Sequence, residues 1–178
     1  MYKKRIADIL LERKLAGKGA VLIEGPKWCG KTTTASMQAK SILDLGDSEI
    51  LKESKSMIEI SPRKLLEGET PRLIDEWQTL PALWDSNRNL VDKRQEVSQF
   101  ILTGSSVLPE AYETTHSGTG RIGRIRMRPM SLYESEESNG RVSLKNLFEG
   151  KDFEIQENSL TIDDIAFLVC RGGWPASI

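Results

Sequence analysis

The residues with the clearest chemical pattern begin at Gly25 and end with Gly30, Lys31 and Thr32, in the spacing GxxxxGK followed by Ser or Thr. They follow an apolar run at residues 20–23 and open a helical pattern, which is the setting that this motif requires. The glycines let the backbone wrap closely around an anion, so that several amide N–H groups point inward. The N-terminus of the following helix adds unpaired donors and the positive end of its dipole. The pattern therefore predicts a loop that binds nucleotide phosphates.

The side chains of this phosphate loop have separate predicted uses. Lys31 would reach the β- and γ-phosphates, and the Thr32 hydroxyl would hold Mg²⁺. Trp28 either covers the phosphates or braces the loop, and Cys29 is either a thiol activated at a helix N-terminus or a small residue in a variable position. An incidental lysine in a structural glycine turn is the alternative. The predicted phosphate-binding residues are Gly25, Pro26, Lys27, Trp28, Cys29, Gly30, Lys31, Thr32 and Thr33.

Two adjacent carboxylates, Asp75 and Glu76, follow the apolar strand pattern at residues 72–74. In an open parallel sheet ligands bind at the carboxyl ends of the strands, so this pair is expected beside the phosphate loop. Asp75 would support Mg²⁺ directly or through a water. Glu76 would orient and deprotonate an attacking water, which contributes about 10²–10⁴-fold in rate. The alternative is a solvated acidic pair at a strand end. Of the two residues that follow, Trp77 is expected to be a packing residue, and Gln78 is a candidate relay of nucleotide state.

Hydroxyl groups follow another apolar run, at residues 100–102. If this strand lies beside the one that carries Asp75, Thr103 or Ser105 would hydrogen-bond the γ-phosphate or the attacking water. An ordinary Gly-Ser turn explains the same residues equally well.

Glycines precede a cluster of arginines in residues 118–128. A loop that presents a cation would stabilise the negative charge that develops in phosphoryl transfer, a contribution of about 10³–10⁵ in rate. Arg121 and Arg124 are the candidates for such an arginine finger, supplied to a neighbouring subunit. Arg124, Arg126 and Arg128 also share one face of a predicted strand. A solvated strand face is therefore the alternative, and a nucleic-acid contact without interleaved aromatic residues is a third.

Strand and helix patterns alternate around these residues, which predicts an α/β fold with a mainly parallel sheet. Residues 2–15 predict an amphipathic helix that docks through Ile6, Ile9 and Leu10. The predicted strands are residues 20–23, 57–60, 72–74, 100–102 and 122–127, and the remaining predicted helices are residues 31–45, a helix starting at Ser61 and Pro62, a helix starting at Thr79, and residues 162–170.

The 178 residues are enough for one substantial domain, expected at residues 1–150, with residues 151–178 as the start of a truncated C-terminal region. A stop just after a helix terminator suggests a fragment of a longer protein. The net charge of −1 gives no global basic field for nucleic acid, and two cysteines with one histidine, His116, argue against a disulfide framework or a metal site of these residues. No apolar run approaches the length of a bilayer and no signal peptide is evident, so a cytoplasmic protein without membrane contact is expected.

Together these motifs resemble the bacterial and archaeal AAA-superfamily ATPases that carry a C-terminal domain of unknown function. A Gly-Arg pair before a strand and a Pro-hydrophobic-Ser segment are matched by residues 120–121 and 129–132, and residues 172–175 resemble the opening of the second domain. The resemblance implies a P-loop NTPase three-layer sandwich of about five strands in the order 5-1-4-3-2. It also implies ATP rather than GTP as the ligand. A lid domain with a second sensor arginine is not recognisable in this sequence.

The expected function is Mg²⁺-dependent ATP binding and hydrolysis coupled to an unidentified conformational task. Lys31, Glu76 and Arg121 are the expected catalytic residues, Thr32 and Asp75 the metal ligands, and a homo-oligomer the expected assembly. The first alternative is a nucleotide-dependent switch or scaffold with negligible hydrolysis. A P-loop kinase is the second, although Glu after Asp suits activation of water better.

Overall fold

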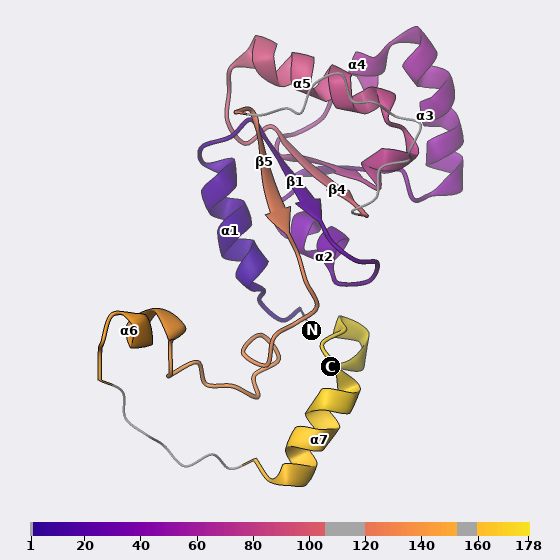
Figure 1. Ribbon diagram of the computed structural model, residues 1–178. Helices are drawn as coiled ribbons and strands as arrows, with labels where there is room; N and C mark the ends of the chain where they lie inside the picture. The colour runs from indigo at the N-terminus through magenta and orange to yellow at the C-terminus, as the bar shows by residue number, and fades with distance from the viewer. Residues whose placement is uncertain (1, 106–119, 153–159) are drawn as a thin grey trace. The chain divides into compact units, whose positions relative to one another are not determined.

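The computed structural model describes residues 2–105, 120–152 and 160–178 (Figure 1). The strands are β1 Ala20–Glu24, β2 Ser41–Asp44, β3 Arg72–Asp75, β4 Phe100–Gly104 and β5 Ile122–Arg126. The helices are α1 Ile6–Leu15, α2 Lys31–Ser36, α3 Ser48–Ile60, α4 Pro62–Leu65, α5 Ala82–Arg94, α6 Leu144–Phe148 and α7 Ile162–Arg171, with 3₁₀ turns η1 Trp77–Thr79 and η2 Pro175–Ser177. In the described part of the chain, no helix combines the length and the apolarity that a membrane crossing needs.

The strands form one parallel sheet in the order β2-β3-β4-β1-β5. This is the predicted order 5-1-4-3-2 read from the other edge, so the predicted P-loop α/β fold is confirmed. β1 lies between β4 and β5, and β4 separates it from β3. Because all the strands run in the same direction, the segments that follow β1, β3 and β4 leave the sheet on the same side, at the carboxyl ends of the strands.

Two apolar cores cover the two faces of the sheet. Along β1, Ala20 and Leu22 enter one core, and Val21 and Ile23 enter the other, as the two-residue period of a strand requires. The first core packs against α3, α4 and α5, and the second packs against α1 and α2 (Figure 1). A central strand that is apolar on both faces is therefore held between two helical layers.

The chain between the phosphate loop and β3 differs from the prediction. The predicted helix at residues 31–45 is wrong, because α2 ends at Ser36 and β2 follows it. Ile42 and Leu43 pair in register with Leu73 and Ile74, and this pairing outweighs the helical spacing of the apolar residues. β-Branched threonines at residues 32–34 also weaken helix continuation.

The predicted strand at residues 57–60 is also wrong, since these residues form the last turn of α3. The helix begins after Asp47, whose side chain accepts hydrogen bonds from the backbone N–H groups of Glu49 and Ile50. An aspartate N-cap of this kind typically stabilises a helix by about 1 kcal/mol. Three apolar residues in a run of four, Met57, Ile58 and Ile60, were too few to separate a strand from a helix end.

The predicted helix at residues 2–15 is present from Ile6 onward, but it docks through a different face. Ala7, Leu11 and Leu15 are buried, whereas the predicted residues Ile6, Ile9 and Leu10 are exposed. The small Ala7 thus takes a place in the core that the prediction gave to larger apolar residues. The size of an apolar side chain alone did not identify the buried face of this helix.

The described backbone divides into two compact units, Arg5–Arg128 and a second unit made of Met1–Lys4 with Pro129–Ile178. Within the second unit, Arg171 donates a hydrogen bond to Glu137 in an ion pair, and the Met130 N–H donates to the Gly173 carbonyl at 2.6 Å. The predicted helix start at Thr161 is confirmed, because Thr161 and Asp164 form a reciprocal capping box. The domain boundary expected at residue 150 stays a prediction.

As the pH is lowered, the Pro129–Ile178 segment is expected to lose stability at a higher pH than the sheet does. The hydrogen bond from Arg171 lowers the pKa of Glu137 from 4.5 to about 2. Because this pKa is depressed in the folded state, its stabilisation is present above the unfolded pKa and is lost as the pH falls toward 2. Amide protection factors in α7 should fall over this range while those of β1 persist. Glu137→Gln should show the reduced α7 protection already at neutral pH, and full protection in this variant would contradict the role of the pair.

Candidate active site

The segment between β1 and α2 is shaped by two glycines. Gly30 is the N-cap of α2 and has φ of 98°, in the left-handed region that favours glycine. A side chain on Gly25 would clash with the carbonyl oxygen of Met127, which lies just beyond β5. The loop can pass this close to Met127 only because residue 25 is a glycine.

Lys31 folds back across the loop that precedes it. Its side chain is only 5 % exposed, and Nζ donates a hydrogen bond to the Pro26 carbonyl at 2.9 Å. The backbone around the loop thus holds a buried cation together with the N-terminal turn of α2. Both features attract an anion.

Three predicted site residues from three separate elements meet at one carboxylate. Asp75 ends β3, and its Oδ1 accepts hydrogen bonds from the Thr32 hydroxyl at 2.9 Å and from the Thr103 hydroxyl. Asp75 and Thr103 are both buried. Thr32 belongs to the first turn of α2 and Thr103 to β4, so the expected convergence of the loop with the acidic strand end is present in the geometry.

Burial is the main cause that raises the pKa of Asp75 above its ordinary value. The hydrogen bonds from Thr103 and Thr32 act in the opposite direction, and the negative charges of Glu76 and Asp44 raise the pKa further. The folded chain therefore holds Asp75 in surroundings that disfavour its charged form. A cation at this point would remove that penalty.

Glu76 occupies a strained backbone position at the carboxyl end of β3. Its φ of 51° and ψ of 43° lie in the left-handed region, which a residue with a side chain rarely adopts. Gln78 Nε2 donates to the Glu76 carboxylate and lies 3.5 Å from the Ser105 hydroxyl. The Gln78 Oε1 atom is buried and has no hydrogen-bond partner among the described residues. Glu76, Gln78 and Ser105 thus form a polar chain from β3 to the end of β4.

Asp44 is a residue of this site that the sequence prediction missed. It ends β2 opposite Asp75 in the strand register, and its charge contributes to the raised pKa of Asp75. The predicted helix at residues 31–45 concealed it. The signal was nevertheless present, since Ile42-Leu43-Asp44 has the same apolar-apolar-aspartate order as Leu73-Ile74-Asp75.

Trp28 and Cys29 have different environments within the loop. Trp28 is 78 % exposed, and Lys27 Nζ lies 5.2 Å from the centre of its ring. Cys29 is fully buried in the core that includes Met127. A thiol in such apolar surroundings is a packing residue rather than a reactive one.

Arg121 lies far from the phosphate loop of its own chain. It precedes Ile122, which pairs with Ala20 at the start of β1, whereas the loop follows the other end of that strand. Five residues of strand correspond to about 16 Å. Arg121 forms an ion pair with Asp92 of α5, and both side chains are partly exposed. Gly118 and Thr119 of the predicted arginine loop lie outside the described residues, as do Ser106 and His116.

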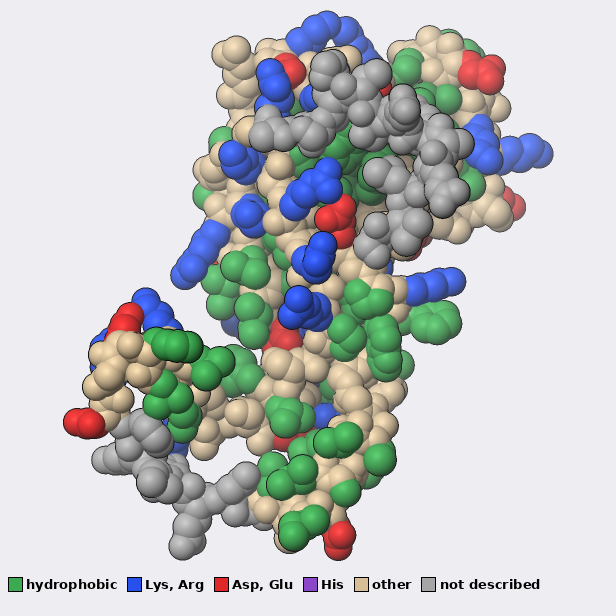
Figure 2. Space-filling model, viewed as in Figure 1, with side chains coloured by type: hydrophobic (Ala, Val, Ile, Leu, Met, Phe, Trp, Pro, Cys, Tyr) green, Lys and Arg blue, Asp and Glu red, His purple; other side chains and the backbone are tan. Residues whose placement is uncertain are grey.

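The other arginines of β5 lie on its solvent face, as the alternation predicted. Arg124 and Arg126 are exposed, and Arg124 Nη1 donates to Glu24 at 3.1 Å. Figure 2 shows Lys and Arg side chains gathered over the face that carries α1 and β5. The solvated-face interpretation therefore accounts for these two residues.

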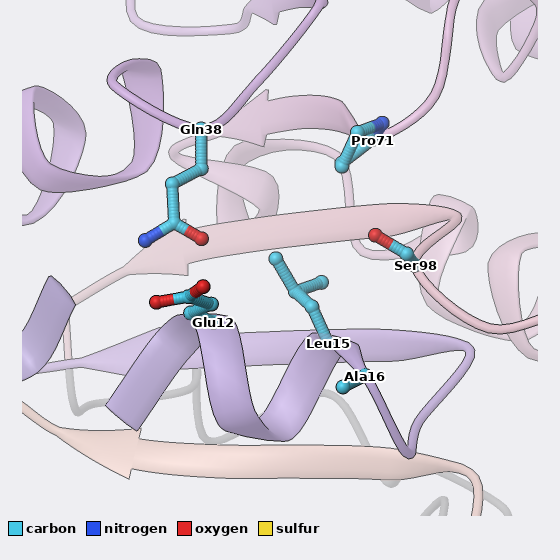
Figure 3. A pocket seen from close by; sticks show the side chains of 6 residues that line it. All are labelled: Glu12, Leu15, Ala16, Gln38, Pro71 and Ser98. Atoms are coloured by element: carbon cyan, nitrogen blue, oxygen red, sulfur yellow. The ribbon is translucent and has the colours of Figure 1, made fainter. Parts of the chain in front are cut away.

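A separate open pocket of about 540 Å³ lies near the amino ends of the strands, away from the phosphate loop (Figure 3). α1 contributes three of its residues, and the others precede β2, β3 and β4; the lining is Glu12, Leu15, Ala16, Gln38, Pro71 and Ser98. These positions are at the amino ends of the strands, so the pocket is distinct from the phosphate loop.

A glycine-shaped loop between a central parallel strand and a helix, beside an aspartate at a neighbouring strand end, defines the P-loop α/β class of protein. Within that class, the chain belongs to the AAA domain family, whose match spans residues 17–136. Members of this family are nucleotide-binding domains of the ATPase type.

Similar solved structures include C. elegans PCH-2, with 15 % identity and a TM-score of 0.43 over 88 % of this chain and 48 % of that one. The FIGL-1 AAA domain in complex with ADP has 14 % identity and a TM-score of 0.41, over 86 % of this chain and 61 % of that one. The chain thus spans about half of the first protein and less than two thirds of the second. No curated protein matches it.

Asp75→Asn is expected to raise the melting temperature of the nucleotide-free protein near neutral pH. The amide keeps an oxygen that can accept from Thr32 and Thr103 but removes a buried charge. Because burial raises the pKa of Asp75, its contribution to stability is lost as the pH rises through the folded-state pKa. The difference in melting temperature from wild type should therefore grow as the pH rises above the ordinary range of an aspartate carboxyl. Thermal unfolding at several pH values measures it, and a variant less stable than wild type at pH 7 would refute this account of the carboxylate.

Proposed function

We propose that the chain is a Mg²⁺-dependent ATPase domain. The observation that carries the proposal is the 2.9 Å hydrogen bond between the Thr32 hydroxyl and Asp75 Oδ1, which joins the phosphate loop to the acidic end of β3. A hydroxyl and a buried carboxylate are oxygen ligands of the kind that Mg²⁺ prefers. Thr32 and Asp75 would hold the ion, which would neutralise phosphate charge.

The remaining residues of the loop would bind the phosphates. Gly25, Gly30 and the amides between them form the cradle, and Lys31 would exchange its bond with the Pro26 carbonyl for one with a phosphate oxygen. Thr103 would keep Asp75 in place from β4. Membership of the AAA domain family supports ATP as the nucleotide.

Glu76 is the proposed base. It would orient the attacking water and take its proton, with Gln78 controlling the direction of the carboxylate through their hydrogen bond. Ser105, at the other end of this polar chain, would hydrogen-bond the γ-phosphate or the water. The strained backbone of Glu76 supports a functional role, since such conformations concentrate at active sites.

Arg121 is proposed to act on the site of a neighbouring copy of the chain. Its distance from its own phosphate loop rules out a role there without a large rearrangement. Its ion pair with Asp92 is partly exposed, and pairs of this kind contribute only about 0–1 kcal/mol, so a second copy can draw the arginine away.

A nucleotide-dependent switch with negligible hydrolysis is the second candidate. Two groups that hydrolysis needs are held by other residues of the chain: Glu76 by Gln78, and Arg121 by Asp92. A chain that keeps both contacts with nucleotide bound would change shape without turnover.

Glu76→Gln separates these two functions. It is expected to bind ATP within about twofold of wild type and to lose about 10²–10⁴-fold in phosphate release, because the amide cannot take a proton. Glu59→Gln, an exposed glutamate on α3, is the matched control and should behave as wild type. Unchanged phosphate release in Glu76→Gln rules out Glu76 as the base. A wild-type protein that binds ATP but releases no phosphate favours the switch.

Arg121→Ala is expected to lower the rate by about 10³-fold or more if the arginine completes a shared site. Mixing Arg121→Ala with Lys31→Ala, both inactive alone, should restore turnover, because one chain then supplies the phosphate loop and the other supplies the arginine. Arg63→Ala, an exposed arginine of α4, is the control. A turnover per subunit that is independent of protein concentration, together with no restoration on mixing, would exclude action between chains.

A further inference from the structure

Arg5 is a buried arginine that the proposed function does not use. It is 5 % exposed, and its guanidinium donates through Nη1 to the Cys29 carbonyl and through Nη2 to the Arg128 carbonyl, each at 2.8 Å. Burying an arginine is costly unless its donors are satisfied. Hydrogen bonds from a charged donor are stronger than those between neutral groups. The planar fork therefore fixes two carbonyls relative to one another.

The first carbonyl controls a peptide group inside the phosphate loop. In a trans peptide the C=O of Cys29 and the N–H of Gly30 point in opposite directions. A guanidinium that holds the Cys29 oxygen on one side therefore fixes the Gly30 N–H on the other. Gly30 has a positive φ and no side chain that would restrict its backbone, so this contact is a restraint that the residue itself does not supply. Arg5 thus restrains an amide of the proposed phosphate cradle.

The second carbonyl belongs to the residue at which the sheet-bearing unit ends. That unit begins at Arg5 and ends at Arg128, so both covalent crossings to the other unit, Lys4–Arg5 and Arg128–Pro129, adjoin this hydrogen bond. The neighbouring Met127 is also tied to the loop region, because its N–H donates to the Glu24 carbonyl at 2.7 Å. One side chain therefore links the phosphate loop to both points where the chain leaves the unit.

We propose that Arg5 is a positioning residue that couples the conformation of the phosphate loop to these two chain crossings. Nucleotide binding, which orders the Gly30 peptide, would tighten the Arg5–Arg128 contact. By thermodynamic reciprocity, a change at the crossings alters nucleotide affinity by the same factor. The inference depends on the proposed function only in that the loop binds nucleotide.

Arg5→Lys tests the coupling, because lysine keeps the charge but cannot span both carbonyls. The probe is a fluorescent ADP analogue with Mg²⁺, and the dissociation constant is expected to rise by about tenfold for the loss of one charge-assisted bond. Arg13→Lys, on the exposed side of α1, is the matched control and should bind as wild type. Retained amide protection in β1 establishes that each variant is folded.

Hydrogen exchange of the Met127 and Arg128 amides, with and without ADP, provides the readout that a merely structural role would not change. In wild type, ADP should increase their protection several-fold, and in Arg5→Lys at saturating ADP this increase should be absent. Unchanged ADP affinity in Arg5→Lys, or an undiminished increase in protection, overturns the coupling and leaves the proposed function intact. A wild-type protein that binds no ADP overturns both. Should Arg5→Lys fail to fold, wild-type amides at 127 and 128 that do not respond to ADP still overturn the coupling.

Discussion

The buried carboxylate of Asp75 is the constraint on which the site depends. Its position follows from the register of the sheet, because Ile74 pairs with Leu102, so the next residues, Asp75 and Thr103, leave β3 and β4 at the same level. β1 pairs with β4 and continues into the loop that returns Thr32 to the same carboxylate. Parallel pairing of β1, β3 and β4 thus brings the three side chains together. A change of register by one residue would turn Asp75 to the other face of the sheet.

The polar residues of the site lower the stability of the fold at the carboxyl ends of the strands. Burial raises the pKa of Asp75, Glu76 has a left-handed backbone conformation, and Gln78 buries an oxygen without a partner among the described residues. The apolar cores on the two faces of β1 and β4 offset these costs, since they bury side chains such as Leu22, Phe100 and Leu102 almost completely. Strain concentrated where a rigid scaffold can sustain it is typical of sites selected for function rather than stability.

The parts of the site that could be predicted from sequence are those whose residues lie close together along the chain. The phosphate loop, the strand that ends in Asp75 and the strand that ends in Thr103 each consist of a short apolar run followed by polar residues, and the sheet order followed from a family resemblance. β2 could not be predicted in this way, because its apolar residues fit either period and only pairing with β3 decides between them. The end of α3 was mistaken for a strand for the same reason, since a short apolar run fits both periods. Because β2 was not predicted, Asp44 at its end was not recognised as a residue of the site. Arg5 had no local signal at all, since its partners Cys29 and Arg128 lie 24 and 123 residues away.

The contacts of the proposed site fall into two energetic classes. Thr32, Asp75 and Thr103 are held by buried hydrogen bonds in strands and a helix, so the part of the site within one chain exists before any ligand arrives. The Arg121 side chain forms a partly exposed ion pair with Asp92 near the amino ends of the strands, and a pair of this kind contributes little stability. The free energy needed to release Arg121 from Asp92 toward a neighbouring copy is therefore small. The proposed ATPase would therefore be limited by the meeting of two copies rather than by assembly of the metal-binding residues, and its rate would report the state of the oligomer.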